Sequence, residues 1–262
     1  MSNVAGIAML EARQLSKYYG AVRAVSDISF HVQQGEILGC LGPNGSGKST
    51  TVKMLTGLLE PTNGEVFFAG ASIRKDLAGY KRRLGYVPEE PNLYPYLSGI
   101  EYLEMVGTLR GIGTRALEEK VGALLWLFGL HGQRHSALAS YSKGMKQKIL
   151  IIAALQHDPE VLVFDEPLSG LDVTSALVFR NLMEELARAG KTILYCSHVL
   201  DVVEKICSRV VIVFRGQVIA HDSVEGLRKV LALPSLEQVY GELVQEINAG
   251  QVAREIAEAM KM

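Results

Sequence analysis

One run of nine residues constrains this chain more than any other feature. It reads Gly42-Pro43-Asn44-Gly45-Ser46-Gly47-Lys48-Ser49-Thr50. A glycine, four residues and then Gly-Lys-Ser form the pattern of a phosphate-binding loop, whose glycines let successive backbone N–H groups turn inward around an anion. The Lys48 ammonium suits the outer phosphates, and the Ser49 hydroxyl suits Mg²⁺. The run therefore predicts that the chain binds a nucleoside triphosphate together with Mg²⁺.

The sequence on either side of the loop supports this motif. Residues Glu36–Leu41 predict a buried strand, and Lys48–Leu59 predict a helix. The apolar side of that helix would consist of Val52, Leu55, Leu58 and Leu59. A strand, a loop and a helix in this order place the positive end of the helix dipole at the phosphates.

A second nucleotide motif lies far downstream. Val161–Phe164 is a short apolar run of the kind found in parallel sheets covered on both faces, and it ends at Asp165 and Glu166. Ligands of open α/β sheets bind at the carboxyl ends of the strands. We therefore expect Asp165 to hold Mg²⁺ and Glu166 to polarise a water aimed at the γ-phosphate. The alternative is a solvated acidic turn before Pro167.

A third motif, Tyr141–Lys148, lies between the other two and carries the resemblance to a family. The chain resembles the ATP-binding subunit of ABC transporters, which has a Leu-Ser-Gly-Gly-Gln signature at this place. Ser142, Gly144 and Gln147 match a variant of the signature, whereas Lys143 and Met145 depart from it. The Tyr-Ser-Lys-Gly-Met form is similar to that of the exporter branch of the family.

Elementary helix chemistry agrees with a binding role for this motif. Ser142 can cap a helix that has Met145, Ile149 and Ile152 on one face. The Ser142 hydroxyl and the Gly144 N–H would then form a second anion site. The resemblance implies that Ser142, Gly144 and Gln147 contact ATP.

Three further positions match the family one at a time. Tyr19, next to the rival Tyr18, resembles the aromatic residue that stacks on adenine, although it can also be a half-buried strand tyrosine. Asp172 is the last residue of the segment Ser169–Asp172, which resembles the family's loop that carries an aspartate across the dimer interface. His198 follows the apolar run Thr192–Ser197 and resembles the switch histidine that hydrogen-bonds the γ-phosphate. A surface or core histidine is the alternative.

Glu89 departs from the commonest family pattern. The chain reads Gly-Tyr-Val-Pro-Glu-Glu over residues 85–90, where the family usually has glutamine after the proline. Glu89 therefore takes the place of the side chain that senses Mg²⁺ and the attacking water. A glutamate keeps an oxygen ligand but adds negative charge near the γ-phosphate. The Pro-Glu-Glu form is similar to the exporter branch, and a solvent-facing turn residue is the alternative.

Composition bounds the remaining possibilities. The chain has 262 residues, 48% of them hydrophobic, and a net charge of −1, so it can bury a large core. It lacks a sustained basic stripe, and we expect no nucleic-acid partner. Its three cysteines, two of them in apolar runs, favour reduced thiols in a cytosolic compartment. No apolar stretch approaches the length of a membrane span, so we expect a different chain to cross the membrane.

The order of the predicted elements gives the expected fold. It is an α/β fold, with a phosphate-loop core, a small antiparallel β subdomain, a helical subdomain and a helical tail. In the antiparallel part, the strand containing Ile28, Phe30 and Val32 is expected to pair with Gly64–Ala69. We expect an ATP-binding domain over residues 1–222, with its helical subdomain at about 98–158, and a helical extension over 223–262.

The extension shows one apolar stripe. Ser235 and Gln238 form a possible capping box, and the stripe contains Leu236, Val239, Tyr240, Leu243 and Ile247. The stripe either packs on its own domain or contacts a second subunit or a partner. We favour the contact.

The family resemblance implies how such a chain works. Each chain has one phosphate loop and one signature, so two copies are expected to sandwich ATP between the loop of one and the signature of the other. Closure on ATP would drive a transmembrane permease on a separate chain, docked near Glu89–Leu103, with this subunit cytoplasmic and peripheral on the inner face of the membrane. Two alternatives remain: a soluble ABC ATPase not engaged in transport, and a weakly hydrolysing regulatory module.

Overall fold

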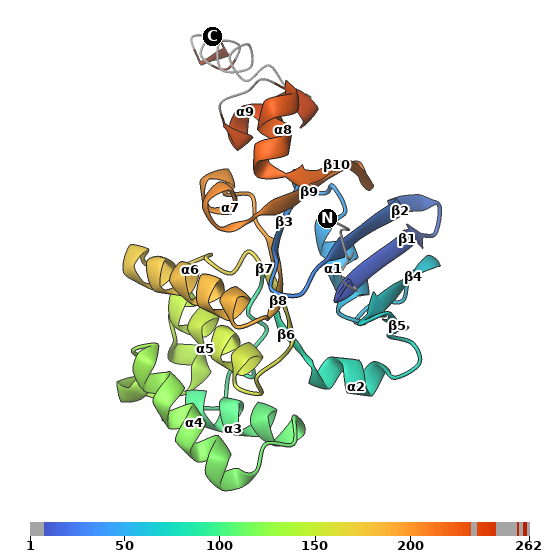
Figure 1. Ribbon diagram of the computed structural model, residues 1–262. Coiled ribbons are helices and arrows are strands. Elements are labelled where there is room, and N and C mark those ends of the chain that lie inside the picture. The colour runs from blue at the N-terminus through green and yellow to red at the C-terminus, as the bar shows by residue number, and fades with distance from the viewer. Residues whose placement is uncertain (1–7, 232–234, 245–255, 257–258, 261–262) are drawn as a thin grey trace.

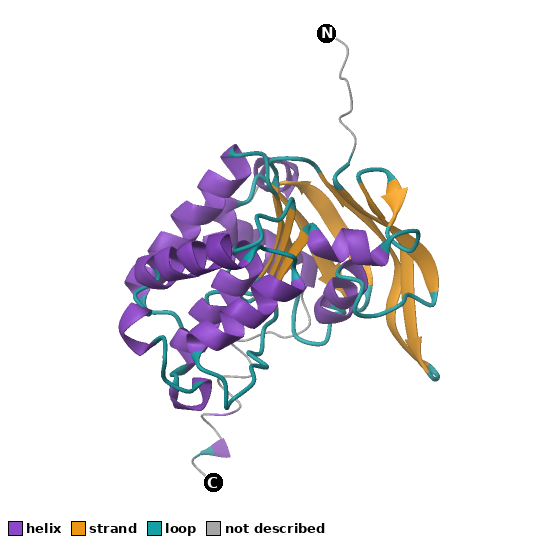
Figure 2. Cartoon of the chain, turned by 90° about the horizontal axis from the view of Figure 1, so that it is seen from below, coloured by secondary structure: helices purple, strands orange, loops and turns teal. Residues whose placement is uncertain are grey.

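The computed structural model describes residues 8–231, 235–244, 256 and 259–260. Within these residues the chain forms two β-sheets with helices packed around them, as Figure 1 shows. Figure 2 shows most helices gathered on one side of the molecule and the antiparallel strands on the other. This is the α/β fold that the sequence predicted, with its phosphate-loop core, small antiparallel sheet and helical lobe.

The larger sheet forms the core. Its six strands lie in the order β10-β9-β3-β8-β7-β6, and only β10 runs antiparallel to its neighbour. Every residue of β3, β7 and β8 is buried, as expected for parallel strands covered on both faces. The strands span β3 Ile37–Leu41, β6 Leu84–Val87, β7 Val161–Asp165, β8 Thr192–Cys196, β9 Arg209–Phe214 and β10 Gln217–Ser223.

The smaller sheet is antiparallel, with the order β2-β1-β4-β5. Its strands span β1 Leu10–Tyr19, β2 Val22–Val32, β4 Asn63–Phe68 and β5 Ala71–Ser72. Ile28, Phe30 and Val32 are buried, as their alternation predicted. The predicted pairing of this strand with residues 64–69 was wrong, because β1 lies between β2 and β4. A two-residue turn joins β1 to β2, so the hairpin partner occupies that edge.

The helical lobe is inserted between β6 and β7, where the sequence placed it. The helices before the tail span α1 Lys48–Leu55, α2 Leu77–Arg82, α3 Gly99–Leu109, α4 Thr114–Leu127, α5 Lys143–Leu155, α6 Val173–Arg188 and α7 Leu200–Ile206, with 3₁₀ turns at His131–Gln133 and Leu138–Ser140. Helix α3 begins with a complete capping box between Ser98 and Glu101. Helix α1 is shorter than predicted, because Gly57 adopts a left-handed φ of 66° just beyond its end. Leu58 is therefore exposed.

The tail packs on the core. It contains α8 Val224–Leu231 and α9 Leu236–Val244, which lie beside α7 in Figure 1. Leu236 and Val239 are fully buried, and Tyr240 and Leu243 pack against the same apolar cluster. The expectation that this stripe contacts another subunit was wrong for these residues, because α7 offers it an apolar surface within the chain. Ile247 lies outside the described residues.

The structure also describes the start of α9, the three cysteines and the lengths of the helices, each of which the sequence had addressed. The Gln238 N–H donates to Ser235 Oγ at 3.3 Å, which is one half of the predicted capping box. Cys40, Cys196 and Cys207 are buried free thiols. Across the described ranges, no helix combines the length and hydrophobicity that crossing a bilayer requires.

Candidate nucleotide-binding site

The register of the parallel strands gathers the predicted motifs at one edge of the sheet. Cys40 of β3 lies opposite Cys196 of β8, which in turn lies opposite Asp165 of β7. The residues that follow these three strands must therefore leave the sheet side by side. They are the phosphate loop, Glu166 and His198, so segments more than 100 residues apart in the sequence meet at one place.

The phosphate loop has a backbone that only small residues can form. Gly47 has a φ of 103°, and a Cβ there would lie 2.8 Å from the Ala24 carbonyl oxygen. The Gly216 N–H donates to the Ser46 carbonyl at 2.8 Å, which ties the loop to the β9–β10 turn. Ser46 Oγ is buried without a hydrogen-bond partner in the described chain. A cradle of this kind with an unmatched polar group fits a bound phosphate.

Lys48 opens helix α1 and lies inside the loop. Its side chain is largely buried, and its Nζ donates to the carbonyl oxygens of Gly42 at 2.6 Å and Pro43 at 3.0 Å. The loop therefore fixes the ammonium beside the positive end of the α1 dipole. Phosphate oxygens are charged acceptors and bind such a group more strongly than carbonyls do.

Asp165 is the buried acid of the site. It is only 4% exposed, and burial raises its pKa to about 6, with the charges of Glu89 and Glu166 adding to the effect and that of Lys48 opposing it. Three carboxylates at one edge repel one another, and a divalent cation would relieve that repulsion. Asp165, Glu89 and the Ser49 hydroxyl supply hard oxygen donors, which fit Mg²⁺ when phosphate oxygens and water complete its shell.

No group of three or more His, Cys, Asp or Glu side chains in the described segments is arranged to hold a metal ion.

Glu166 is held by the segment that follows β8. Its Oε1 accepts the backbone N–H of His198 at 2.8 Å and lies 2.7 Å from His198 Nδ1, and its Oε2 accepts the Ser197 hydroxyl at 3.2 Å. Glu166 has a left-handed φ of 49°, which costs a non-glycine residue on the order of 1–3 kcal/mol and is typical of functional sites. The His198 side chain is 71% exposed, so it can reach a ligand.

The phosphate loop, Asp165 and Glu166 surround a cavity of about 640 Å³, a size that fits a nucleotide, and His198 is not part of its wall. Its walls include Asn44, Gly45, Gly47, Lys48, Ser49, Thr50, Glu89, Asp165 and Glu166, all predicted from the sequence. Val22, Arg23, Ala24, Arg215 and Gly216 complete the walls and were not predicted. Val22, Arg23 and Ala24 begin strand β2, and Arg215 and Gly216 form the β9–β10 turn. The local signals near them are Gly20 and the Arg-Gly pair at 215–216.

The structure does not place Tyr19 in the wall of this cavity. Tyr19 is half exposed, and its cross-strand partner Val22 forms part of the wall instead. Tyr18 is also partly exposed, and Lys17 Nζ lies 5.7 Å from the Tyr19 ring centre. Tyr19 therefore lies next to the mouth of the cavity rather than within it.

The signature residues lie at a different place on the same chain. Ser142 is exposed and caps α5 by accepting the Met145 N–H at 3.2 Å, as its position predicted. Gly144 packs so closely on the Gly170 carbonyl that a Cβ would collide with it. Asp172 is exposed and caps α6 through the Ser175 N–H at 2.8 Å. The two caps are adjacent to each other, and neither lines the 640 Å³ cavity.

Gln147 does not have the exposed position expected of a residue that contacts ATP. It is fully buried, and its Nε2 donates to the Pro167 carbonyl at 3.1 Å. The side chain points into the chain because it lies on the inner side of α5, so it is not available to a ligand in this conformation. Gln147 instead joins the signature helix to the loop that follows Glu166.

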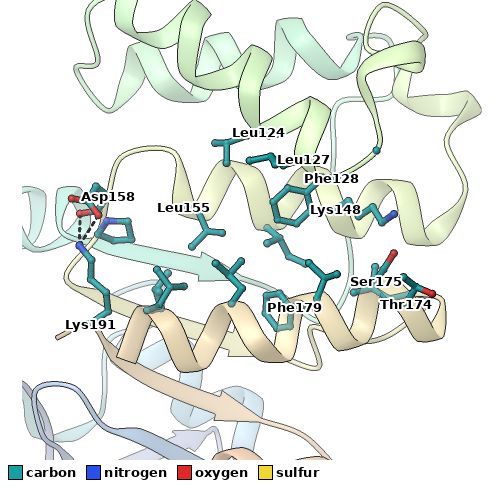
Figure 3. A pocket seen from close by; sticks show the side chains of 18 residues that line it. Leu124, Leu127, Phe128, Lys148, Leu155, Asp158, Thr174, Ser175, Phe179 and Lys191 are labelled. Carbon is teal, nitrogen blue, oxygen red and sulfur yellow. Dashed lines mark hydrogen bonds and ion pairs between the residues drawn. The ribbon is translucent and has the colours of Figure 1, made fainter. Parts of the chain in front are cut away.

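A separate apolar cavity of about 590 Å³ lies between α4, α5 and α6 (Figure 3). Leu124, Leu155 and Phe179 are among its lining residues, and an ion pair of 2.6 Å between Lys191 and Asp158 marks one end. The phosphate loop and the acidic pair are absent from this lining. The nucleotide site is therefore assigned to the sheet edge.

Comparison with known proteins agrees with this geometry. The family model described as "ABC transporter" matches residues 25–169, from β2 through the loop after β7. The chain belongs to the ABC transporter family. ABC transporter cassettes are ATPases, so this chain is an ATP-binding and ATP-hydrolysing subunit of the ABC type.

Individual relatives match over most of their length. The chain is 37% identical to the ABC transporter ATP-binding protein NatA of Bacillus subtilis (strain 168), over 79% of this chain and 84% of NatA. It is 33% identical to the bacitracin transport ATP-binding protein BcrA of Enterococcus faecalis, over 96% of this chain and 78% of BcrA. A solved ATP-binding subunit of an ABC transporter superposes with a TM-score of 0.85 at 34% identity, covering 90% of this chain and 99% of that one.

Proposed function

We propose that this chain powers an exporter, and that two copies close around Mg²⁺-ATP to drive a transmembrane partner. One observation carries the proposal. The phosphate loop, Asp165 and Glu166 share one cavity, and His198 is bonded to Glu166 beside it, whereas the exposed caps Ser142 and Asp172 lie outside it. An ABC site needs both sets of groups on one ATP, and a second copy of the chain can supply the missing set.

Hydrolysis would use groups whose positions support their roles. Lys48 and the loop N–H groups would bind the phosphates. Glu166 would accept a proton from the attacking water, since its carboxylate is held by Ser197 and His198 at the cavity wall. His198 would contact the γ-phosphate from its exposed position. Mg²⁺, held by Ser49, Asp165 and Glu89, would neutralise phosphate charge.

The proposed dimer has two-fold symmetry. In it, each phosphate loop faces the N-termini of α5 and α6 of the partner, where Ser142 and Gly144 offer N–H and hydroxyl donors to phosphate. Asp172 would lie at the subunit boundary. Contact between α5 and the Glu166 loop through Gln147 would couple the two sites of the dimer, because the signature and Glu166 of one chain belong to different sites.

The proposed direction of transport, export, is supported by the signature variant, by the Pro-Glu-Glu variant and by the names of relatives. One relative is named for bacitracin transport, and a second, 38% identical over 81% of this chain and 68% of its own length, is the linearmycin resistance ATP-binding protein LnrL of Bacillus subtilis (strain 168). The permease would dock near residues 89–103, where Tyr94 and Tyr96 are exposed. Exposed aromatic side chains of this kind are frequent anchors in protein interfaces.

Two measurements test the proposal. Phosphate release by the purified chain should be Mg²⁺-dependent and should nearly stop in Glu166→Gln, while ATP binding persists. A tagged chain should also retain a transmembrane protein from detergent-solubilised native membranes, and Tyr96→Asp should lose it. Trp126→Asp, which alters an exposed aromatic residue on α4, is the matched control and should retain it. Retention by neither the parent nor the control would contradict the transport role.

A further inference from the structure

The C-terminal tail reaches the nucleotide site. A second, smaller cavity of about 310 Å³ lies against the phosphate loop, and one of its walls comes from α9. Its lining includes Pro43, Asn44, Glu89, His198, Leu200 and Tyr240. Four of these belong to the proposed ATP machinery or its loop, whereas Tyr240 lies more than forty residues further along the chain.

Helix α9 is fixed to α7 rather than resting loosely on it. Leu236 and Val239 are fully buried in the core cluster that also contains Val203 and Ile206 of α7. Glu204 of α7 accepts the Leu236 N–H at 3.3 Å. The same carboxylate binds Arg228 of α8 at 3.3 Å. One acidic residue of α7 therefore holds both tail helices.

Helix α7 is in turn coupled to His198 by a very short segment. The helix starts at Leu200, two residues after His198. The Val199 N–H donates to Ser197 Oγ at 3.1 Å, and that hydroxyl donates to Glu166. A shift of α7 would therefore move the groups that hold the Glu166 carboxylate.

We propose that α9 positions His198 for hydrolysis and that Tyr240 is the positioning residue. This inference rests on the proposed role of His198 and Glu166. Tyr240 and Leu200 line the small cavity together with the phosphate loop and His198, and both pack against the same core cluster. In this position the Tyr240 ring would limit how far the His198 segment can move away from Glu166. Tyr240 acts through His198 and is not itself a catalytic residue.

The test compares substitutions in α9 in the purified full-length chain. Tyr240→Ala removes the ring, Tyr240→Phe keeps it, and Gln238→Ala alters an exposed side chain of the same helix. Leu243→Ala removes packing against the core cluster without touching the small cavity. Each variant is measured for ATP affinity, for kcat and KM, and for the His198 ring signals in NMR spectra, assigned with His198→Gln.

We expect Tyr240→Ala to lower kcat by about tenfold or more with ATP affinity within about twofold of the parent, because a misplaced catalytic group reduces the rate without weakening phosphate binding. The His198 signals should shift in this variant. Tyr240→Phe and Gln238→Ala should retain the parental kcat, and Leu243→Ala should lower thermal stability while leaving the His198 signals in place.

The inference is overturned if Tyr240→Ala keeps the parental kcat, or if Tyr240→Phe is as slow as Tyr240→Ala, since the ring is then not what matters. It is also overturned if Leu243→Ala shifts the His198 signals equally. Failure of the proposed function looks different. In that case Glu166→Gln would hydrolyse ATP as fast as the parent, whatever the tail variants do.

Discussion

Replacement of Leu236 by alanine tests whether the tail is part of the folded core. Leu236 is fully buried among side chains of α7 and the central sheet. A buried leucine-to-alanine change costs about 2–5 kcal/mol, because transfer free energy is lost and a cavity remains. For a chain of this size each kcal/mol lowers the melting temperature by roughly 2–4 °C, so a loss near 3 kcal/mol corresponds to about 6–12 °C.

Thermal unfolding followed by circular dichroism provides the assay, and Leu109→Ala provides the control. Leu109 ends α3 and is 79% exposed, so the same chemical change there should shift the melting temperature by no more than about 2 °C. Light scattering with Mg²⁺-ATP should show that Leu236→Ala still dimerises at temperatures where it is folded. If Leu236→Ala melts like Leu109→Ala but fails to dimerise, the tail stripe acts between subunits and the packing argument fails.

Three further outcomes follow from the site and its surroundings. Lys48→Ala should weaken ATP binding by roughly ten- to a hundredfold, since a charge-assisted contact contributes about 1.5–3 kcal/mol. Lys53→Ala, on the exposed side of α1, should bind ATP like the parent in the same titration. Equal affinities for the parent and Lys48→Ala would contradict the assignment. Glu89→Gln keeps an oxygen ligand, so its rate of phosphate release should stay within about tenfold of the parent. Glu89→Ala loses that ligand, so it should be slower and require more Mg²⁺. If Glu89→Ala has the parental Mg²⁺ dependence, Glu89 is a solvated turn residue. Burial and then the Arg110 charge lower the pKa of His157 to about 4, and burial likewise lowers that of His221 to about 4. The unfolded chain binds these protons near pH 6.5 but the folded chain does not, so the free energy of unfolding should fall as the pH drops from about 6.5 towards 4. In thermal melts between about pH 7 and pH 5, His157→Gln should lose less stability than the parent, and an equal loss in both would contradict the role of His157.

The features that local chemistry determines were predictable. The phosphate loop, the buried strand before Asp165 and the Ser142 cap each depend on a few consecutive residues, and all three occur where the sequence placed them. The helices inserted between β6 and β7 run from Gly99 to Leu155, within the range of about 98–158 that the sequence predicted.

The features that depend on distant packing were not predictable. Nothing near Gln147 indicates that its amide donates to Pro167, twenty residues away and on another element. The apolar stripe of α9 looks the same whether it meets its own α7 or another chain, and only the fold decides between them. Arg23 and Arg215 enter the cavity wall because the start of β2 and the β9–β10 turn, from different sheets, meet beside the loop, a contact without a local signal.

If each ATP lies between the phosphate loop of one copy and the signature of another, two variants that are each inactive should regain activity when they are mixed. Lys48→Ala disables the loop. Ser142→Asp keeps the helix cap, since aspartate is a good N-cap, but places a negative charge where phosphate would approach. At an ATP concentration below the parental KM, each variant alone should lose most of its activity, and both should melt close to the parent.

In an equal mixture, about half of the dimers pair one variant with the other, and each such dimer contains one intact composite site. Phosphate release should therefore recover to about a quarter of the parental rate per chain. A mixture no more active than its separate components would contradict this arrangement, because every site would then be built from a single chain.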